Sequence, residues 1–324
     1  MRAAAADLDA VCRRMRGETG VALAVHEKPD PDALGAAAGM LDLCGQLGVA
    51  AALYVTPGES LPLEELLLGG RRVLRTDPPA ALPVYALDCG AAQRLALAAP
   101  PAGVAVNIDH HHDNPRYGEL NLVRASASST CEIVCDLYSA MGLAPAEAAA
   151  TALYVGISFD SGHFHHGSTS ARTFACASWL VGLGVEVTAV YGELYERRSL
   201  AALRLWARAV RTAATVAGGR ALVATLACDD YAVCCAGEEE TEGIVESLRA
   251  VNGVEAAALV KEQSDGARVR VSLRSSALDV SAIAALRGGG GHRLAAGFSS
   301  DDSPEEVSAW LSSELARRLS TASS

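Results

Sequence analysis

Residues 107–113 constrain this chain more than any other stretch, because they read Asn-Ile-Asp-His-His-His-Asp. The apolar residues 104–106 lead directly into them and predict a buried strand. Ionisable groups at the end of a buried strand need partners or a metal ion, since an unpaired buried charge is unfavourable. Imidazole and carboxylate together suit a divalent transition metal. The alternative is a polar surface turn that happens to hold three histidines.

Two earlier predicted strands also end in side chains of this kind. The apolar strand at residues 21–25 is followed, on a segment whose two prolines disfavour a helix, by His26, Asp30 and Asp32. The strand at residues 84–87 is followed by Asp88. Strands that alternate with helices predict a parallel sheet, and such sheets bind ligands beyond the carboxyl ends of their strands. We therefore expect these side chains to meet at one edge of a sheet.

The rest of the first half shows the alternation that this sheet requires. One further strand is expected at residues 51–55, and helices are expected at residues 3–16, 33–47, 62–68, 145–157 and 170–183. Another helix begins near Ser129, which forms a capping-box pattern with Glu132. Asp160 follows the helix of residues 145–157 and adds a fourth ligand-type cluster.

The length of 324 residues predicts two domains. The expected boundaries are a metal-binding domain at residues 1–190, a charged linker helix at 191–212, and a smaller α+β domain at 213–324. By composition, the linker helix could equally be one more surface helix of the first domain. In the second domain, two strands are expected within residues 213–227, further strands at 254–260 and 269–273, and helices at 241–251, 280–286 and 304–319.

A glycine-rich segment stands out in the second domain, where residues 287–293 read Arg-Gly-Gly-Gly-Gly-His-Arg. Consecutive glycines let backbone amides approach an anion closely, and the flanking arginines and His292 add cationic donors. This composition favours a phosphate-binding loop over the alternative, a flexible turn.

Composition excludes several classes of function. A net charge of −11 argues against an extended surface for duplex nucleic acid, although bound cations would reverse the field around a small anionic substrate. No long charge-free apolar stretch predicts a membrane span, and acidic residues near the N-terminus argue against a signal peptide, so a cytoplasmic location is expected. The nine cysteines form no C-x-x-C pair, and those in apolar runs, such as Cys135 and Cys176, are expected to act as small hydrophobic residues without disulfides.

The predicted ligand set consists of two imidazoles and four carboxylates: His26, Asp30, Asp32, Asp88, His110 and Asp160. This set is sufficient for two divalent ions with a shared ligand, the arrangement that supports in-line displacement at phosphorus by a water that the ions deprotonate. Its hard and borderline ligands suit Mn²⁺, so two Mn²⁺ ions are the expected cofactors.

The same stretches resemble the four motifs of the DHH phosphoesterases, in the family's order. They are residues 26–32, 88–90, 109–111 and 156–162. Arg274 with Ser275, and the glycine run with the Ala-Ala-Gly of residues 295–297, look like the family's associated C-terminal domain. Within the superfamily, length and C-terminal motif most resemble the nanoRNase/pAp phosphatase branch. Pro31 stands where glycine is common in the family, and Ser158 and Ser161 where threonines are, but no ligand is lost.

The resemblance implies roles for individual residues. His26, Asp30 and Asp88 would hold one metal ion, and the other would be held by Asp32, Asp88, His110 and Asp160. His111 would stabilise charge on the scissile phosphate, and Asp109 would orient the histidine pair. The residues expected to contact substrate across a cleft between the domains are Arg274, Ser275, Gly289, Gly290, Gly291 and His292. His112 is expected to be exposed, and no metal is expected at His163, His165 or His166.

These roles imply a metal-dependent phosphoesterase. Its substrates would be short oligoribonucleotides, dinucleotides such as pApA or cyclic di-AMP, or 3′-phosphoadenosine 5′-phosphate (pAp). A homodimer is one expected assembly. The alternatives are an inorganic pyrophosphatase, a RecJ-like exonuclease, and a regulator that binds nucleotides without hydrolysing them. The glycine-rich segment argues against the pyrophosphatase, and the complete ligand set argues against the regulator.

Overall fold

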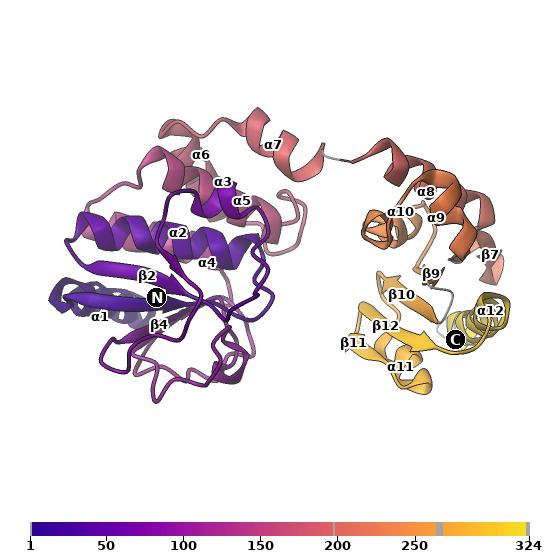
Figure 1. The fold of residues 1–324 in the computed structure, drawn as a ribbon, viewed down its shortest axis with the longest axis horizontal. Helices are drawn as coiled ribbons and strands as arrows, with labels where there is room; N and C mark the ends of the chain where they lie inside the picture. Colours follow the sequence, from indigo (N-terminus) through magenta and orange to yellow (C-terminus); the bar gives the residue numbers. More distant parts are fainter. Residues whose placement is uncertain (1, 197, 264–267, 322–324) are drawn as a thin grey trace. The chain divides into compact units, whose positions relative to one another are not determined.

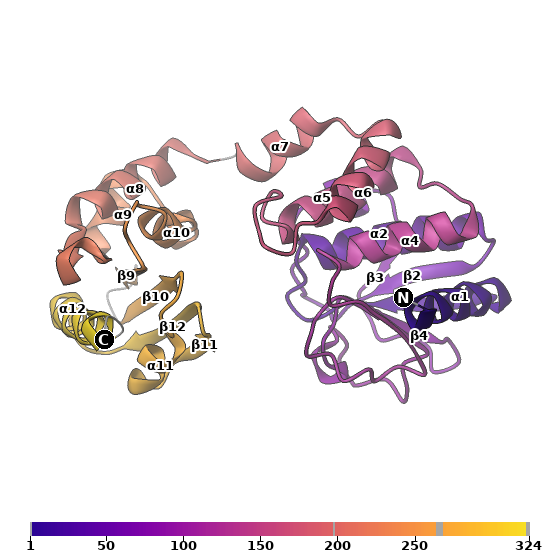
Figure 2. The same ribbon diagram turned by 180° about the vertical axis from the view of Figure 1, so that it is seen from behind.

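The computed structural model describes residues 2–196, 198–263 and 268–321 (Figure 1). The chain divides into two compact units, Met1–Leu194 and Tyr195–Ser324, each with a sheet and hydrophobic clusters of its own. Figure 2 shows the helices and sheet of each unit from behind.

The N-terminal unit is built on a six-stranded sheet in which every pair of neighbouring strands is parallel. Its strands are β1 (Gly20–Ala24), β2 (Ala50–Tyr54), β3 (Val73–Leu74), β4 (Val84–Leu87), β5 (Val106–Asp109) and β6 (Leu120–Val123). Their spatial order is β3-β2-β1-β4-β5-β6, so the chain changes direction across the sheet between β1 and β4. Ligands of open parallel sheets bind at such a switch point.

The helices of this unit are α1 (Arg2–Gly17), α2 (Pro31–Gln46), α3 (Glu64–Leu68), α4 (Thr130–Met141), α5 (Glu147–Asp160), α6 (Ala171–Gly182) and α7 (Val187–Tyr195). On β1, Val21 and Leu23 point into a large core with α1, α2, α4 and α5. The alternate residues Ala22 and Ala24 belong to a smaller cluster that contains Leu95. Side chains of one strand alternate between the faces of a sheet, so the larger core lies on one face and the smaller cluster on the other.

The C-terminal unit contains a mixed six-stranded sheet of order β11-β12-β10-β9-β8-β7. Its strands are β7 (Ala214–Val216), β8 (Ala221–Leu226), β9 (Ala256–Glu262), β10 (Val269–Ser275), β11 (Gly290–His292) and β12 (Ala295–Ser300). Among the strand pairs described for this sheet, β8–β9 is parallel and the others are antiparallel. The helices α11 (Ser281–Ala284) and α12 (Pro304–Thr321) pack in one core, and those of the second core are α8 (Leu200–Thr212), α9 (Cys228–Cys234) and α10 (Ile244–Arg249).

The predicted fold class is therefore confirmed: a parallel α/β unit precedes a smaller α+β unit. The predicted strands at residues 21–25, 51–55 and 84–87 are present. The strand expected at 104–106 lies later, at Val106–Asp109, so Asp109 belongs to the strand itself.

Several local predictions were wrong or incomplete. A single helix was expected at residues 191–212, but two helices cover this region. The first, α7, ends at Tyr195, and the second, α8, begins at Leu200 with Ser199 as its N-cap. Part of the glycine run is not a loop, because Gly290–His292 pairs with β12. The strands β3, β6, β11 and β12 and the helix α9 were not predicted, since their short or polar sequences carry weak periodic signals.

Among the helices that the structure describes, none is by itself long and apolar enough to cross a membrane; only the pair α6 and α7, bent by 114°, reaches the required length and composition together.

Candidate metal centre

The first ligand-type cluster lies where β1 ends and α2 begins. Asp30 is the N-cap of α2, and its Oδ1 accepts hydrogen bonds from the backbone N–H groups of Asp32 (2.9 Å) and Ala33 (3.1 Å). Pro31 is the first helical residue, where its fixed φ suits a helix start and its missing N–H is not needed. The cap thus holds the carboxylates of Asp30 and Asp32 at the start of α2, while His26 lies just after β1.

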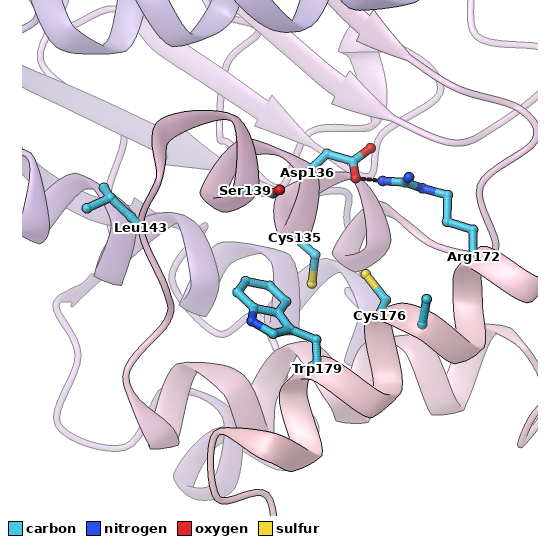
Figure 3. Close-up of a pocket in the computed structure, with 8 residues that line it drawn as sticks. Cys135, Asp136, Ser139, Leu143, Arg172, Cys176 and Trp179 are labelled. Atoms are coloured by element: carbon cyan, nitrogen blue, oxygen red, sulfur yellow. Dashed lines mark ion pairs between the residues drawn. The ribbon is translucent and has the colours of Figure 1, made fainter.

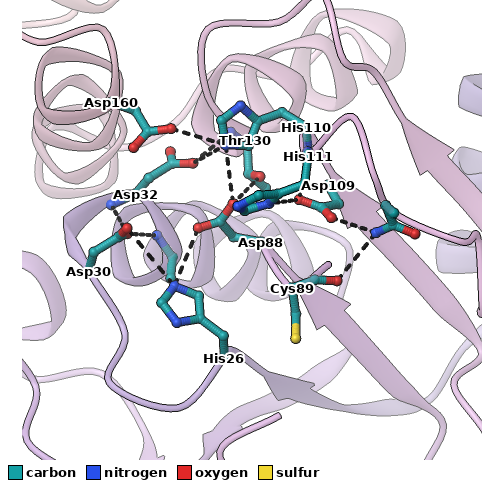
Figure 4. Close-up of polar contacts among 12 residues, drawn as sticks. His26, Asp30, Asp32, Asp88, Cys89, Asp109, His110, His111, Thr130 and Asp160 are labelled. Carbon is teal, nitrogen blue, oxygen red and sulfur yellow. Dashed lines mark hydrogen bonds and ion pairs between the residues drawn. The ribbon is translucent and has the colours of Figure 1, made fainter. Parts of the chain in front are cut away.

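Asp88 occupies the centre of the cluster, directly after β4 (Figure 4). Its Oδ2 lies 3.6 Å from Nε2 of His26, and its Oδ1 lies 3.5 Å from Nε2 of His110. Nδ1 of His111 is 3.7 Å from the same Oδ1. The two oxygens of one carboxylate therefore face different histidines, which is the arrangement that a ligand shared between two ions requires.

The end of α5 completes the cluster from the other side. Nε2 of His110 lies 3.0 Å from Oδ2 of Asp160 and 4.0 Å from Oδ2 of Asp32. The described residues contain three groups of potential metal ligands. Within each group, the ligand atoms all lie within 4.8 Å of one another. They are His26 with Asp30 and Asp88, Asp32 with His110 and Asp160, and Asp88 with His110 and His111.

The electrostatics of these groups favour a bound cation. Burial and the negative charge of Asp88 raise the pKa of Asp30 and that of the fully buried Asp32. Burial alone would lower the pKa of His26, but its pairing with the Asp88 carboxylate outweighs this effect and raises the pKa to about 9. For His110, the hydrogen bond to Asp160 likewise outweighs burial and raises the pKa to about 10. The protons on these histidines balance the crowded carboxylates, and divalent ions would replace them.

The donor chemistry fits such ions. The six predicted ligands, which supply carboxylate oxygens and imidazole nitrogens, are brought together from the ends of β1, β4, β5 and α5 and the start of α2. Asp32 and Asp88 are 0% and 2% exposed, a burial that unpaired carboxylates rarely tolerate. No thiol belongs to any of these groups among the residues described, so the site suits hard or borderline cations.

Asp109 is buried and holds His111 in place. Its Oδ1 accepts hydrogen bonds from the backbone N–H groups of His110 (2.7 Å) and His111 (3.2 Å), and it lies 2.7 Å from Nδ1 of the His111 ring. Nδ2 of Asn114 donates to the other oxygen at 2.5 Å. Burial alone would raise the pKa of Asp109, but these bonds from His111 and Asn114 lower it, so the carboxylate stays charged. The bond at Nδ1 leaves Nε2 of the half-buried His111 available to a substrate.

The N-terminus of α4 donates hydrogen bonds to two of the carboxylates. The sequence analysis did not predict this contact. The backbone N–H groups of Thr130 and Cys131 donate to Asp32 at 2.7 and 3.0 Å. Oγ1 of Thr130 donates to Oδ1 of Asp88 at 2.9 Å. Helix N-termini favour negative charge, so α4 stabilises the ionised cluster. The capping-box pattern located this helix, but only the tertiary structure shows where its first turn points.

The other predicted histidines do not join the cluster. His112 is exposed, as expected. His163, His165 and His166 belong to none of the ligand groups among the described residues. Instead, the ring of His163 lies 5.1 Å from that of Tyr191, and Nδ1 of His166 lies 3.2 Å from the backbone oxygen of Asp160.

In the C-terminal unit, the sheet aligns two of the predicted substrate contacts. Arg274 on β10 and His292 on β11 both pair with Ala295 on β12, so they lie on one face with a small residue between them. Nε of Arg274 is 2.8 Å from Oε1 of Glu246. The hydroxyl of Ser275 has partners inside the unit, because it donates to the backbone oxygen of Glu255 and accepts from the N–H of Leu278.

The backbone conformation and the space around each of residues 288–291 explain glycine at these positions in different ways. Gly288 and Gly291 have φ values of +70° and +139°, and a Cβ on Gly289 would lie 2.3 Å from the backbone oxygen of Gly297. A Cβ on Gly290 would meet nothing within 4 Å. Gly290 is exposed and lies on the strand that carries His292, so its bare backbone is free to approach a ligand.

Comparison with known proteins finds two known domains in the chain. The N-terminal domain of the DHH family matches residues 20–157, and the DHHA1 domain matches residues 229–320. The bifunctional oligoribonuclease and PAP phosphatase NrnA of Thermus thermophilus is 32% identical over 86% of this chain and 84% of its own length. The chain belongs to the DHH family.

Two further comparisons extend this result. The protein of the same name from Bacillus subtilis is 27% identical over 85% of this chain and 87% of its own length. A crystal structure of an exopolyphosphatase-related protein from Bacteroides fragilis superposes with a TM-score of 0.82, at 22% identity, over 96% of this chain and 95% of that one. This structural likeness shows that both units of the DHH chain have a known fold.

Proposed function

We propose that this protein is a metal-dependent phosphoesterase that hydrolyses short oligoribonucleotides and pAp. The main support for the proposal is the position of Asp88 at the switch point of the sheet. Its two carboxylate oxygens lie 3.5–3.7 Å from three histidine nitrogens. The substrate class is supported by the relatives named oligoribonuclease and PAP phosphatase, which match both units.

The residues have distinct roles in this proposal. The six residues predicted as ligands would hold two divalent ions, with Asp88 shared and Mn²⁺ as the ion that their oxygen and imidazole donors suit. Such ions would supply positive charge to the phosphoryl group and acidify a water molecule. His111, oriented by Asp109, would donate a hydrogen bond to a phosphoryl oxygen. Arg274 and His292 would bind a further phosphate, and Gly290 would let its backbone approach.

The remaining features of the proposal follow the sequence predictions. A cytoplasmic location, a homodimer and a cleft between the units stay predictions. The pyrophosphatase and exonuclease alternatives have less support, because the relatives that match most of this chain in sequence carry the NrnA name.

The decisive experiment is hydrolysis of pApA and pAp by the purified protein, followed as release of AMP with Mn²⁺ and with EDTA. Wild-type protein should release AMP only with the metal. Asp88→Ala should lose activity because the shared ligand is removed. Asp113→Ala is the matched control, since Asp113 is exposed and belongs to none of the described ligand groups.

Two outcomes would contradict the proposal. A wild-type rate in Asp88→Ala would rule out the proposed centre. Tight nucleotide binding without release of AMP, from protein loaded with metal, would favour the regulator instead.

A further inference from the structure

A pocket of about 420 Å³ lies between α4 and α6, outside the metal centre. It is lined by Cys135, Asp136, Ser139, Leu143, Arg172, Ala175, Cys176 and Trp179 (Figure 3). Ser139, Arg172 and Ala175 are exposed, whereas Cys135 and Cys176 are buried. The pocket therefore has a solvent-facing rim and thiols on its inner wall.

The two thiols form a pair that the sequence analysis did not predict. Cys135 belongs to α4 and Cys176 to α6, and they are 2% and 9% exposed. Both side chains line the pocket, and Figure 3 shows the two sulfur atoms pointing toward each other beside the ring of Trp179. Two thiols in contact can join as a disulfide when an oxidant reaches either one.

The surroundings make the two thiols unequal. Cys176 is the more exposed of the two, and its interaction with the Cys135 thiol and the charge of Arg172 lower its pKa against the effects of burial and of Glu132. Cys135 is almost fully buried, and burial raises its pKa. Arg172 is held at the rim by ion pairs with Glu132 and Asp136 of α4. Cys176, the more exposed thiol with Arg172 nearby, is therefore the one expected to react first as a thiolate, and Cys135 is the one expected to resolve it.

We propose that Cys135 and Cys176 are a modification site at which a hydroperoxide, such as hydrogen peroxide, forms a disulfide between α4 and α6. The Cys176 thiolate attacks one peroxide oxygen, the O–O bond breaks, and the departing hydroxide takes up a proton to give water. The sulfur of Cys135 then attacks the resulting sulfenic acid, so that the S–S bond forms and the S–O bond breaks. The second hydroxide leaves with the proton of Cys135, and in total two thiols and one peroxide give one disulfide and two water molecules.

The bond would link the two helices at a point where they already interact. Thr173 of α6 donates to Glu132 of α4 at 2.9 Å, one turn from the pocket. A cross-link between residues distant in sequence restricts the unfolded chain, so the oxidised protein should unfold at a higher temperature. This inference does not depend on the proposed function, because its readouts are a covalent bond and thermal unfolding.

The test treats fully reduced protein with a small excess of hydrogen peroxide, blocks the remaining thiols, and maps the peptides by mass spectrometry without reduction. A Cys235→Ser background is used, since Cys235 is exposed and would otherwise link two molecules. The expected result is a Cys135–Cys176 peptide pair that has lost two hydrogen atoms, is reversed by dithiothreitol, and is accompanied by a higher Tm. Cys44, which is buried and whose pKa burial raises to about 12, should remain a free thiol.

Substitutions separate the two steps. In Cys135→Ser, Cys176 should stop at the sulfenic acid, which a dimedone probe captures, and in Cys176→Ser neither product should form. Oxidation of Cys176 to the sulfinic acid in the parent protein, without a cross-link, would overturn the proposal. So would peroxide treatment that leaves both thiols free while other cysteines react.

Discussion

At the scale of single residues, the carboxylate of Asp88 is oriented from two sides. Its backbone adopts a left-handed conformation with φ of +52°, which is uncommon for residues other than glycine and often occurs at functional sites. Thr130 fixes the side chain by donating to Oδ1. Both features aim the two oxygens at separate histidines, so the geometry of the centre depends on a residue that is not itself a predicted ligand.

Thr130→Val should therefore weaken Mn²⁺ binding by about 10- to 100-fold, the usual effect of removing a hydrogen bond to a metal ligand. Valine keeps the shape of the side chain and the backbone N–H that donates to Asp32. Titration calorimetry measures the affinity, and Thr130→Ser, which keeps the hydroxyl, serves as control. An unchanged affinity in the valine variant would show that Thr130 does not support the site.

At the scale of elements, close packing of helices brings the carboxylates together. A Cβ on Gly35 of α2 would lie 2.4 Å from the backbone oxygen of Ala152 of α5 and 2.9 Å from Sγ of Cys131 of α4. A Cβ on Gly156 of α5 would lie 2.3 Å from the same sulfur. Glycine at both positions lets three helices approach closely beside Asp32, whose backbone oxygen accepts a hydrogen bond from Cys131.

Gly35→Ala should reduce the free energy of unfolding of the N-terminal unit by about 1–3 kcal/mol, because the added methyl group overpacks this junction. Gly45→Ala in the same helix is the matched control. Gly45 is exposed and a Cβ there meets nothing within 4 Å, so alanine should stabilise the helix by up to about 1 kcal/mol. Urea unfolding distinguishes them, and equal effects would refute the packing explanation.

The helix α12 offers a prediction of pH dependence. Hydrogen bonds from Arg317 and Arg318 lower the pKa of Glu314 to about 2, although burial opposes them. An unfolded glutamate has a pKa near 4.3, so this carboxylate stabilises the fold above about pH 4.3 and loses its contribution as the pH falls toward 2.

Glu314→Gln should accordingly lower the free energy of unfolding by about 0.5–1 kcal/mol at pH 7, the range of exposed or partly exposed ion pairs. The difference from wild type should shrink as the pH is lowered from 5 to 3. Urea unfolding at several pH values measures it. A difference that stays constant over this range would mean that the charge of Glu314 is not the cause.

At the scale of the whole molecule, the two units have separate cores. The predicted metal ligands all come from Met1–Leu194, whereas Arg274 and His292 come from Tyr195–Ser324. Each unit buries its own clusters of apolar side chains, which is the property that lets a domain fold independently.

We expect two transitions in calorimetry of the intact protein. Mn²⁺ should stabilise only the N-terminal unit. At a concentration 100 times the Kd, it should increase the free energy of unfolding of that unit by about 2.7 kcal/mol and raise the temperature of its transition. Leu311→Ala truncates a fully buried side chain of α12. It should reduce the free energy of unfolding of the C-terminal unit by about 2–5 kcal/mol and lower only the temperature of that unit's transition. A single transition that responds to both changes would show that the units unfold together.

The sequence by itself determined the kind of fold and the predicted ligands. Apolar runs that end in His26, Asp88 and Asp109 could be recognised locally, and parallel strands necessarily bring such ends to one edge of a sheet. For this reason, side chains far apart in the chain could be grouped from their local sequence context alone. Elements with weak periodicity, such as β6 and β11, could not be located in this way.

Only the tertiary structure decided which side chains meet across helices. The contact of Thr130 with Asp88, the bond of Asn114 to Asp109 and the pairing of Cys135 with Cys176 depend on how helices and loops rotate and pack against one another. Hydrophobic periodicity reports which face of a helix is buried, but many rotations and registers satisfy the same pattern. Close packing of specific side chains selects one of them, and that selection is a property of the folded chain as a whole.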